Sequence, residues 1–153
     1  MTTIEKRLRE LGVTLPQPAA PVANYVPFVR SGALVYIAGQ ISSTPEGLIR
    51  GIVGADLNLE QGVAAARASA INLIAQMKAA CEGDLHRVRR IVKLTGFVAS
   101  TPEFTDHPKV INGASDLMVA VFGEAGRHAR AAVGAPSLPR GAAVEIDAVV
   151  ELV

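Results

Sequence analysis

A single arginine stands in a run of small residues close to the C-terminal end of the sequence. In the stretch ARAAVGA, residues 129–135, an extended chain places Arg130, Ala132 and Gly134 on the same side of a strand. The guanidinium group carries five N–H donors in a planar fork, and its two small neighbours leave open space beside it. Arginine can hold a small carboxylate through two parallel hydrogen bonds, so Arg130 is predicted to bind one.

Glu145 is a second charged residue in an otherwise apolar segment. It lies in AAVEIDAVVELV, where the residues at alternate positions from Ala142 to Leu152 are all apolar and Glu145 belongs to the other side. If the last two strands pair as a hairpin, Glu145 can come close to Arg130. A simple ion pair between these two residues is then an alternative to a binding site.

Other side chains with reactive groups give weaker indications. Cys81 falls at the expected end of a helix, where the role of a small apolar residue is favoured over that of a nucleophile. His86, His107 and His128 are too scattered to predict a metal site, and the sequence contains no CxxC or HExxH motif. His128 is a candidate acid–base group beside Arg130, with a structural role as the alternative.

Composition and charge restrict the classes of protein. The 153 residues suffice for one domain over 1–153, in which 1–20 form an N-terminal helix and an extended connector. The net charge is +1 and only 4% of the residues are aromatic, so no nucleic-acid partner is expected. No apolar stretch approaches the roughly 20 residues of a membrane-spanning helix, and no signal peptide is apparent. A cytoplasmic protein without a membrane partner is therefore expected.

The hydrophobic pattern predicts the order β-β-β-α-β-α-β-β after a short N-terminal helix. The expected strands cover 27–30, 33–40, 48–52, 88–99, 129–135 and 142–153. The expected helices cover 4–11, 59–81 and 108–122, with caps at Asn58 and at Asp106 or His107. This order favours an α+β fold in which two amphipathic helices pack on one face of a single mixed sheet.

The face of the sheet opposite the helices mixes charged and apolar side chains. In the last strand this face carries Glu145, Asp147, Val149, Glu151 and Val153. In the strand 88–99, alternation predicts that one face carries Val92, Leu94, Gly96 and Val98. The opposite face then carries Ile91, Lys93, Thr95 and Phe97. A half-apolar face is usually buried against another surface, so a homo-oligomer is predicted.

Three ordered blocks of the sequence carry a family resemblance. They are ANYVPFVRSGALVYIAGQIS, VINGASDLMVAVFG and the tail HARAAVGAPSLPRGAAVEIDA. Over 20–153 the chain resembles the RidA/YjgF family of reactive-intermediate deaminases, some of which carry an older description as translation-inhibiting endoribonucleases. The resemblance implies a chorismate mutase-like (YjgF-like) fold that assembles into a homotrimer with pockets between subunits.

The resemblance also implies an activity and a set of site residues. Family members of the deaminase type hydrolyse enamines and imines such as 2-aminoacrylate, released by pyridoxal-phosphate-dependent dehydratases, to 2-keto acids and ammonia without a cofactor or a metal. Arg130 is similar to the family's carboxylate-binding arginine, and Glu145 to the glutamate that holds the attacking water. Tyr25 fits the tyrosine that closes the pocket, Asn112 reaches it from a helix, and Gly39 belongs to a Gly-Gln turn at its floor.

Three positions depart from the deaminase pattern. Ala38 stands where many deaminases have a serine, so a hydroxyl that could position water is missing. Ala132, in the substrate pocket, replaces a frequently modified cysteine, and the segment TDHPK, 105–109, is longer than in the deaminase prototypes. A non-catalytic trimer that binds small carboxylates or keto acids in a regulatory role is the alternative function. Ribonuclease activity is disfavoured by the near-neutral charge and the few aromatic residues.

Overall fold

A computed structural model describes residues 2–18 and 23–153. The main sheet has five strands in the order β1-β2-β7-β5-β6, and a separate ribbon pairs β3 with β4. The strands are β1 (Phe28–Ser31), β2 (Leu34–Ile41), β3 (Ser43–Thr44), β4 (Gly47–Leu48), β5 (Val88–Ala99), β6 (Ala129–Ala135) and β7 (Val144–Leu152). The α-helices are α1 (Thr3–Glu10), α2 (Leu59–Ala80) and α3 (His107–Phe122), and the 3-10 helices are η1 (Leu85–Arg87), η2 (Gly123–Gly126) and η3 (Pro139–Gly141). The predicted α+β class is confirmed.

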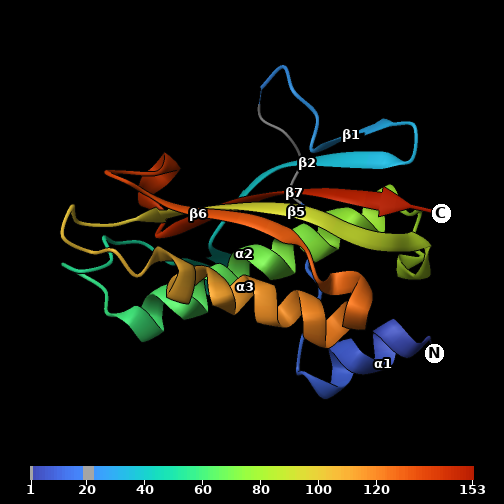
Figure 1. The fold of residues 1–153 in the computed structure, drawn as a ribbon, viewed down its shortest axis with the longest axis horizontal. Helices are drawn as coiled ribbons and strands as arrows, with labels where there is room; N and C mark the ends of the chain where they lie inside the picture. Colours follow the sequence, from blue (N-terminus) through green and yellow to red (C-terminus); the bar gives the residue numbers. More distant parts are fainter. Residues whose placement is uncertain (1, 19–22) are drawn as a thin grey trace.

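The long helices α2 and α3 lie side by side on one face of the sheet, and no α-helix of the described residues covers the opposite face (Figure 1). A capping box starts α2, in which Asn58 and Gln61 each accept a hydrogen bond from the other's backbone N–H at 2.8 Å. In α3, Pro108 occupies the first turn as predicted, while Asp106 stands at the N-cap without a side-chain hydrogen bond. No helix of the described residues is long and apolar enough to cross a membrane.

The N-terminal segment is more closely packed than a surface helix. Ile4 and Leu8 of α1 are buried, and the Arg7 side chain donates a hydrogen bond of 3.0 Å to the carbonyl of Val121 at the end of α3. The described residues of the proline-rich connector, 13–18 and 23–27, contain no helix or strand. The remainder of the connector lies outside the described residues.

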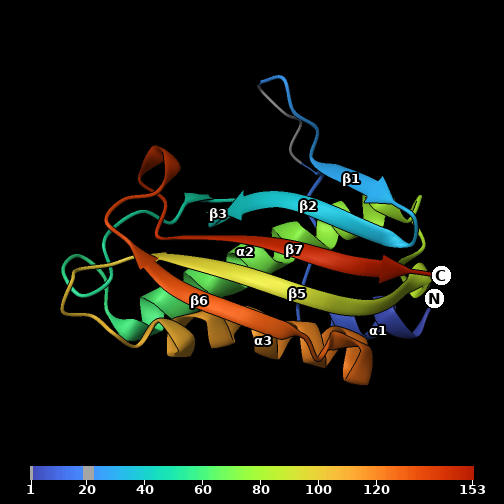
Figure 2. The ribbon, with the colours of Figure 1, turned by 45° about the horizontal axis from the view of Figure 1, so that its top comes forward.

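The pairing of the last two strands differs from the predicted hairpin. Strand β5 lies between β6 and β7, is antiparallel to β7 and is parallel to β6 (Figure 2). The helix α3 forms the crossover between the parallel strands β5 and β6, which leaves β6 at the edge of the sheet. The chain then passes over the end of β5 to reach β7, so sequence neighbours are not spatial neighbours here.

Two local predictions are wrong for reasons of backbone geometry. The strand expected over 48–52 reduces to the short β3–β4 ribbon and a single bridge at Arg50, because Gly51 adopts φ +130° and ends the extended run. In β5, the register shifts between Ile91 and Lys93, so Ile91 turns into the core and is fully buried. Leu94, Gly96 and Val98 keep their predicted place under the helices, whereas Val92 stands at the register shift and is only partly buried.

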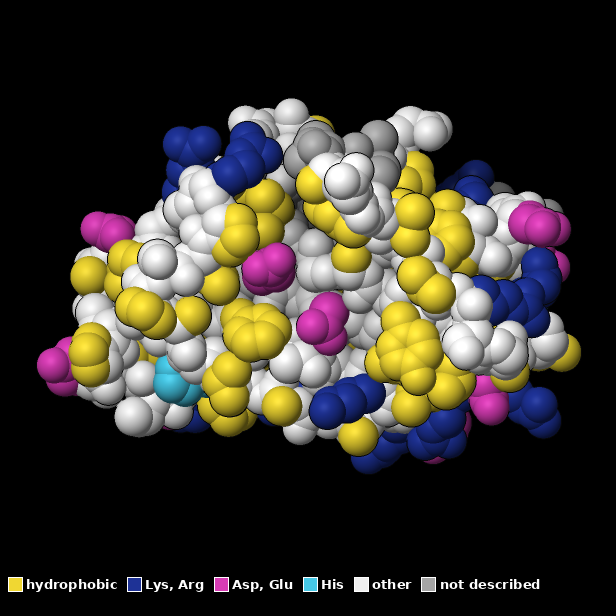
Figure 3. Space-filling view, turned by 90° about the horizontal axis from the view of Figure 1, so that it is seen from above, with side chains coloured by type: hydrophobic (Ala, Val, Ile, Leu, Met, Phe, Trp, Pro, Cys, Tyr) yellow, Lys and Arg dark blue, Asp and Glu magenta, His cyan; other side chains and the backbone are white. Residues whose placement is uncertain are grey.

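The helix-free face carries a band of partly exposed apolar side chains around acidic ones (Figure 3). Register places Val29 beside Tyr36 and Tyr36 beside Val149 in adjacent strands, with Val29 53% and Tyr36 49% exposed. A second row runs from Val133 through Phe97 to Glu145. This face of the chain is too apolar for a sheet surface that meets only water.

Candidate functional site

Arg130 points from the edge strand toward α3. Its register partner in β5 is Leu94, a fully buried residue, so Arg130 belongs to the helix-covered side of the sheet. One amino nitrogen of its guanidinium group donates hydrogen bonds to Asn112 Oδ1 at 2.8 Å and to Ser115 Oγ at 3.1 Å. The predicted association of Arg130 with Asn112 is therefore present within one chain.

These two bonds leave the rest of the guanidinium group available. The amino nitrogen has two hydrogens, which Asn112 and Ser115 take up, and both acceptors are uncharged. Within residues 2–18 and 23–153, no hydrogen bond or ion pair reaches Nε or the second amino nitrogen of Arg130. These two nitrogens form the edge that binds a carboxylate through parallel hydrogen bonds.

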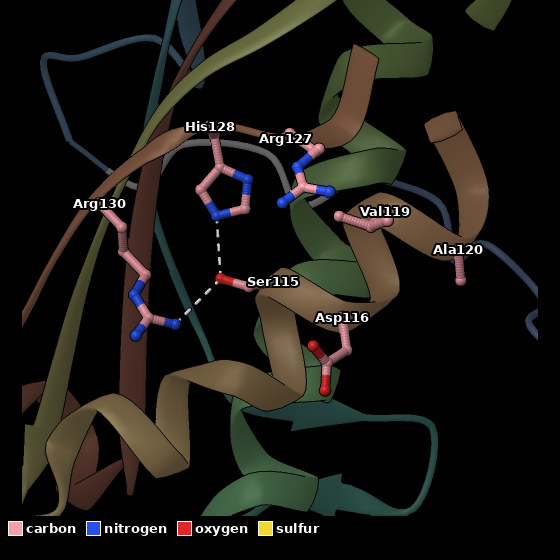
Figure 4. Close-up of a pocket in the computed structure, with 7 residues that line it drawn as sticks. All are labelled: Ser115, Asp116, Val119, Ala120, Arg127, His128 and Arg130. Carbon is pink, nitrogen blue, oxygen red and sulfur yellow. Dashed lines mark hydrogen bonds between the residues drawn. The ribbon is translucent and has the colours of Figure 1, made fainter. Parts of the chain in front are cut away.

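A serine and a histidine extend the hydrogen-bonded chain behind Arg130 (Figure 4). His128 Nδ1 lies 2.6 Å from the carbonyl oxygen of Gly126, to which it donates, and its Nε2 lies 2.9 Å from Ser115 Oγ. With Nδ1 protonated, the neutral ring accepts from the Ser115 hydroxyl, whose oxygen in turn accepts from Arg130. Burial is the largest cause and lowers the pKa of His128; the hydrogen bond to Gly126 opposes this shift, and the Arg130 charge adds to it. The lowered pKa favours this neutral form.

Ser115 is not among the site residues predicted from the sequence. Its position three residues after Asn112 could have predicted a shared role, because residues three apart lie on one face of a helix. Beyond the guanidinium group, an open depression of about 600 Å³ separates α3 from the start of β6, with Arg127 and His128 on one side and Asp116 on the other (Figure 4). The depression is open to solvent and carries both basic and acidic side chains, so its lining does not indicate one class of ligand.

Glu145 lies on the opposite face of the sheet from Arg130. It is registered with Phe97 of β5 and Ile41 of β2, on the helix-free side. Strand β5 also separates the strands that carry the two residues, so the alternative of an ion pair between Arg130 and Glu145 within one chain is wrong. Burial, and then the charge of Asp147, raise the pKa of Glu145, which makes it a stronger base when ionised.

Gly39 packs directly against the Glu145 carboxylate. A Cβ atom at position 39 would lie 2.6 Å from Glu145 Oε1, so any larger residue would force the Glu145 side chain to move from its present position. The predicted turn at Gly39 is not a turn, because this residue lies inside β2, where the register to β7 shifts between Ile37 and Gln40. The irregularity brings the backbone at Gly39 close to Glu145.

Tyr25 is distant from the arginine along the sheet. It precedes β1, the edge strand opposite to β6, and is 54% exposed. The backbone N–H of Ala38 donates to the carbonyl of Pro27 at 2.9 Å, so the segment that carries Tyr25 runs beside this part of β2. The predicted residues thus form one group around Arg130, Asn112 and Ala132, and a second around Gly39 and Glu145 on the other face.

A mixed five-stranded sheet with two helices on one face, and an arginine presented from its edge strand, define the YjgF class of small α+β proteins. Residues 5–152 match the family described as "YjgF/chorismate mutase-like, putative endoribonuclease", and the chain belongs to this family. The assignment made from the three sequence blocks is confirmed.

Several relatives place the chain within this family. It is 52% identical to Protein TCP17 of Trypanosoma cruzi over 151 residues, covering 97% of this chain and 94% of the relative. The crystal structure of Atu1372 from Agrobacterium tumefaciens, a protein of unknown function, is 53% identical with a TM-score of 0.93, covering 99% of this chain and 93% of that one. RidA from a Psychrobacter species is 29% identical with a TM-score of 0.59, covering 89% and 94% of the two chains.

Proposed function

We propose that the chain hydrolyses reactive enamines and imines of the 2-aminoacrylate type to 2-keto acids and ammonia. The observation that carries this proposal is the open Nε edge of Arg130, held by Asn112 and Ser115 beside the small residues Ala132 and Gly134. The substrate's carboxylate binds at this edge, and the guanidinium group fixes the adjacent reacting carbon. Such positioning contributes to the rate because the reacting groups no longer have to find each other by diffusion.

Glu145 supplies the base in this proposal. In the reaction, the enamine gains a proton on carbon and loses one from nitrogen to give the imine. Water then adds to the C=N carbon, and the resulting carbinolamine releases ammonia to leave the keto acid. Glu145 orients the water and takes its proton, a role typically worth about 10²- to 10⁴-fold in rate.

A complete pocket requires two copies of the chain. Within one chain Arg130 and Glu145 face opposite sides of the sheet, so one copy supplies the carboxylate grip and another the base. The apolar band of Val29, Tyr36 and Val149 on the helix-free face offers the surface for this assembly. We infer a homotrimer with a pocket at each subunit boundary. Tyr25, which is exposed in the single chain, contributes its side chain to this pocket.

A coupled assay tests the proposal. A threonine or serine dehydratase generates the enamine, and the appearance of 2-keto acid is followed with and without this protein. We expect the wild type to accelerate the release of 2-keto acid. Arg130→Ala should lose this acceleration, and Arg9→Ala should keep it. The control removes an exposed arginine of α1 that lies outside the site. Release at the uncatalysed rate with a correctly assembled wild type overturns the proposal.

Ala38 favours one alternative, a non-catalytic binder of small carboxylates. The side chain at this position has no hydroxyl, although it stands next to Gly39 in the irregular part of β2. Binding of 2-oxobutanoate that needs Arg130, without any acceleration of imine hydrolysis, would identify such a binder. Activity gained by Ala38→Ser would then show that the missing hydroxyl accounts for the difference.

A further inference from the structure

Ser115 and His128 form a hydrogen-bonded pair with the parts of a serine nucleophile and its base. Ser115 Oγ lies 2.9 Å from His128 Nε2, a distance at which a neutral imidazole can take the hydroxyl proton. A nucleophilic serine needs such a base, and the base in turn needs a third group that fixes its ring. Figure 4 shows the serine pointing from α3 toward the space between His128 and Arg130.

The carbonyl group of Gly126 supplies this third group. It accepts a hydrogen bond from His128 Nδ1 at 2.6 Å, which holds the proton on Nδ1 and leaves Nε2 free to act as a base. The carbonyl itself is fixed, because Gly126 packs so closely on α3 that a Cβ atom here would collide with the carbonyl oxygen of Met118. The roles follow the order of a serine, histidine and aspartate triad, with a backbone carbonyl in place of the aspartate.

Arg130 places a positive charge beside the same hydroxyl. Its amino nitrogen donates to Ser115 Oγ at 3.1 Å, so the guanidinium group stabilises the negative charge that develops on this oxygen when its proton leaves. When Oγ attacks a carbonyl carbon, the carbonyl oxygen that becomes negative is bonded to that same carbon and lies near the guanidinium group. Arg130 can therefore stabilise the tetrahedral intermediate, as the donors of an oxyanion hole do.

The open depression between α3 and the start of β6 leaves room for a substrate in front of Ser115. Val119 follows Ser115 by four residues and is its neighbour on the helix face, and Ala120 lies beside it in the lining. Val119 is 40% exposed, so these two side chains offer an apolar strip on which a short acyl chain can be buried. The charged side chains of the lining do not indicate one ligand, but the serine and its base define a reaction.

We propose that Ser115 is a nucleophile that accepts short acyl groups from esters, with His128 as its general base. Oγ attacks the carbonyl carbon and its proton passes to Nε2; the bond from this carbon to the alcohol oxygen then breaks, and the alcohol leaves with that proton. Water attacks the acyl group and gives its proton to Nε2, the bond to Oγ breaks, and the proton returns to Ser115 as the carboxylic acid leaves. All these groups lie within one chain and Glu145 takes no part, so this activity goes beyond the proposed function.

Two reagents test the proposal on the assembled protein. Hydrolysis of p-nitrophenyl acetate is followed by the release of p-nitrophenol. Phenylmethylsulfonyl fluoride forms a stable serine sulfonate as fluoride leaves, and peptide mass spectrometry then locates the label, which we expect on Ser115. The rate of p-nitrophenol release should fall about 10²-fold in Ser115→Ala and in His128→Gln, whose amide accepts a hydrogen bond but cannot serve as the base. Ser137→Ala removes an exposed serine outside the depression and should keep the wild-type rate.

The label distinguishes a nucleophile from a serine that only positions Arg130. Ser115→Ala also removes the hydrogen bond to Arg130, so a lower rate in this variant alone does not identify the nucleophile. A hydroxyl with a purely structural role stays unlabelled in the wild type, and that result overturns the inference. Release of p-nitrophenol at the same rate with the wild type and with a folded His128→Gln variant also overturns it, because His128 is then not the base.

Discussion

The guanidinium group of Arg130 and the side-chain oxygen of Asn112 are joined at 2.8 Å, which fastens the edge strand β6 to the helix α3. The acceptor is an amide rather than a carboxylate. It therefore orients the guanidinium group without neutralising it, and the full positive charge remains for an anionic ligand.

Asn112→Asp should weaken carboxylate binding at least tenfold. The substituted side chain has nearly the same shape, but its negative charge forms an ion pair with Arg130 and competes with the ligand. Calorimetric titration with 2-oxobutanoate measures the change. Ala64→Asp, which adds the same charge at an exposed position of α2, should leave the affinity within twofold. An Asn112→Asp variant that binds as well as the wild type would contradict the proposed anchor.

Ser115→Ala should cost about fivefold in affinity for 2-oxobutanoate, in line with the loss of one hydrogen bond that positions Arg130. Ser115→Thr keeps the hydroxyl and should restore much of the affinity. Lys109→Ala, an exposed residue of the same helix, serves as the control in the titration. If the alanine and threonine variants lose affinity equally, the hydroxyl does not position the arginine.

Gly39→Ala should lower kcat/KM for imine hydrolysis by about 10²- to 10⁴-fold, because the added Cβ forces the Glu145 carboxylate out of its present position. Its affinity for 2-oxobutanoate should stay within twofold, since Arg130 is untouched. The double variant Gly39→Ala/Glu145→Gln should lose little more than either single variant. Losses that simply multiply would show that Gly39 acts independently of Glu145.

Glu145→Gln should remove activity and yet raise the thermal stability at pH 7. Burial and Asp147 raise the pKa of Glu145 above its unfolded value, so ionisation of this group disfavours the folded state. This loss of folding free energy is complete above the pKa of Glu145 in the folded state. It decreases as the pH falls through that pKa, and it vanishes below the pKa of Glu145 in the unfolded chain. The stabilisation should therefore be largest at neutral pH and disappear in acid. Melting curves from pH 4 to 8 measure it, and a variant less stable than the wild type at every pH would contradict this sign.

The sequence predicted side-chain direction more reliably than strand neighbours. Alternation placed Arg130, Ala132 and Gly134 on one face correctly, because the period of two is a local property of an extended chain. Pairing depends on contacts between distant segments, and here β5 separates β6 from β7 although β6 and β7 are consecutive. The predicted proximity of Arg130 and Glu145 failed for this reason.

The remaining differences also arise from geometry that no residue pattern records. The shifted register at Ile91 moved a side chain into the core against the simple alternation. Ser115 shares a helix face with Asn112, but its contacts with Arg130 and His128 form only because α3 packs beside β6. Helix capping at Asn58 and the start of α3 near Pro108 were predictable because they depend on neighbouring residues alone.

The crossover from β5 through α3 to β6 gives the two predicted groups of site residues very different separations along the chain. Arg130 and Asn112 are separated by only 18 positions, so their bond closes a short loop at low entropic cost. Gly39 and Glu145 meet only after segments from near both ends of the chain have paired in β2 and β7. We therefore expect the Arg130–Asn112 contact to need less ordering of distant segments than the contact between Gly39 and Glu145.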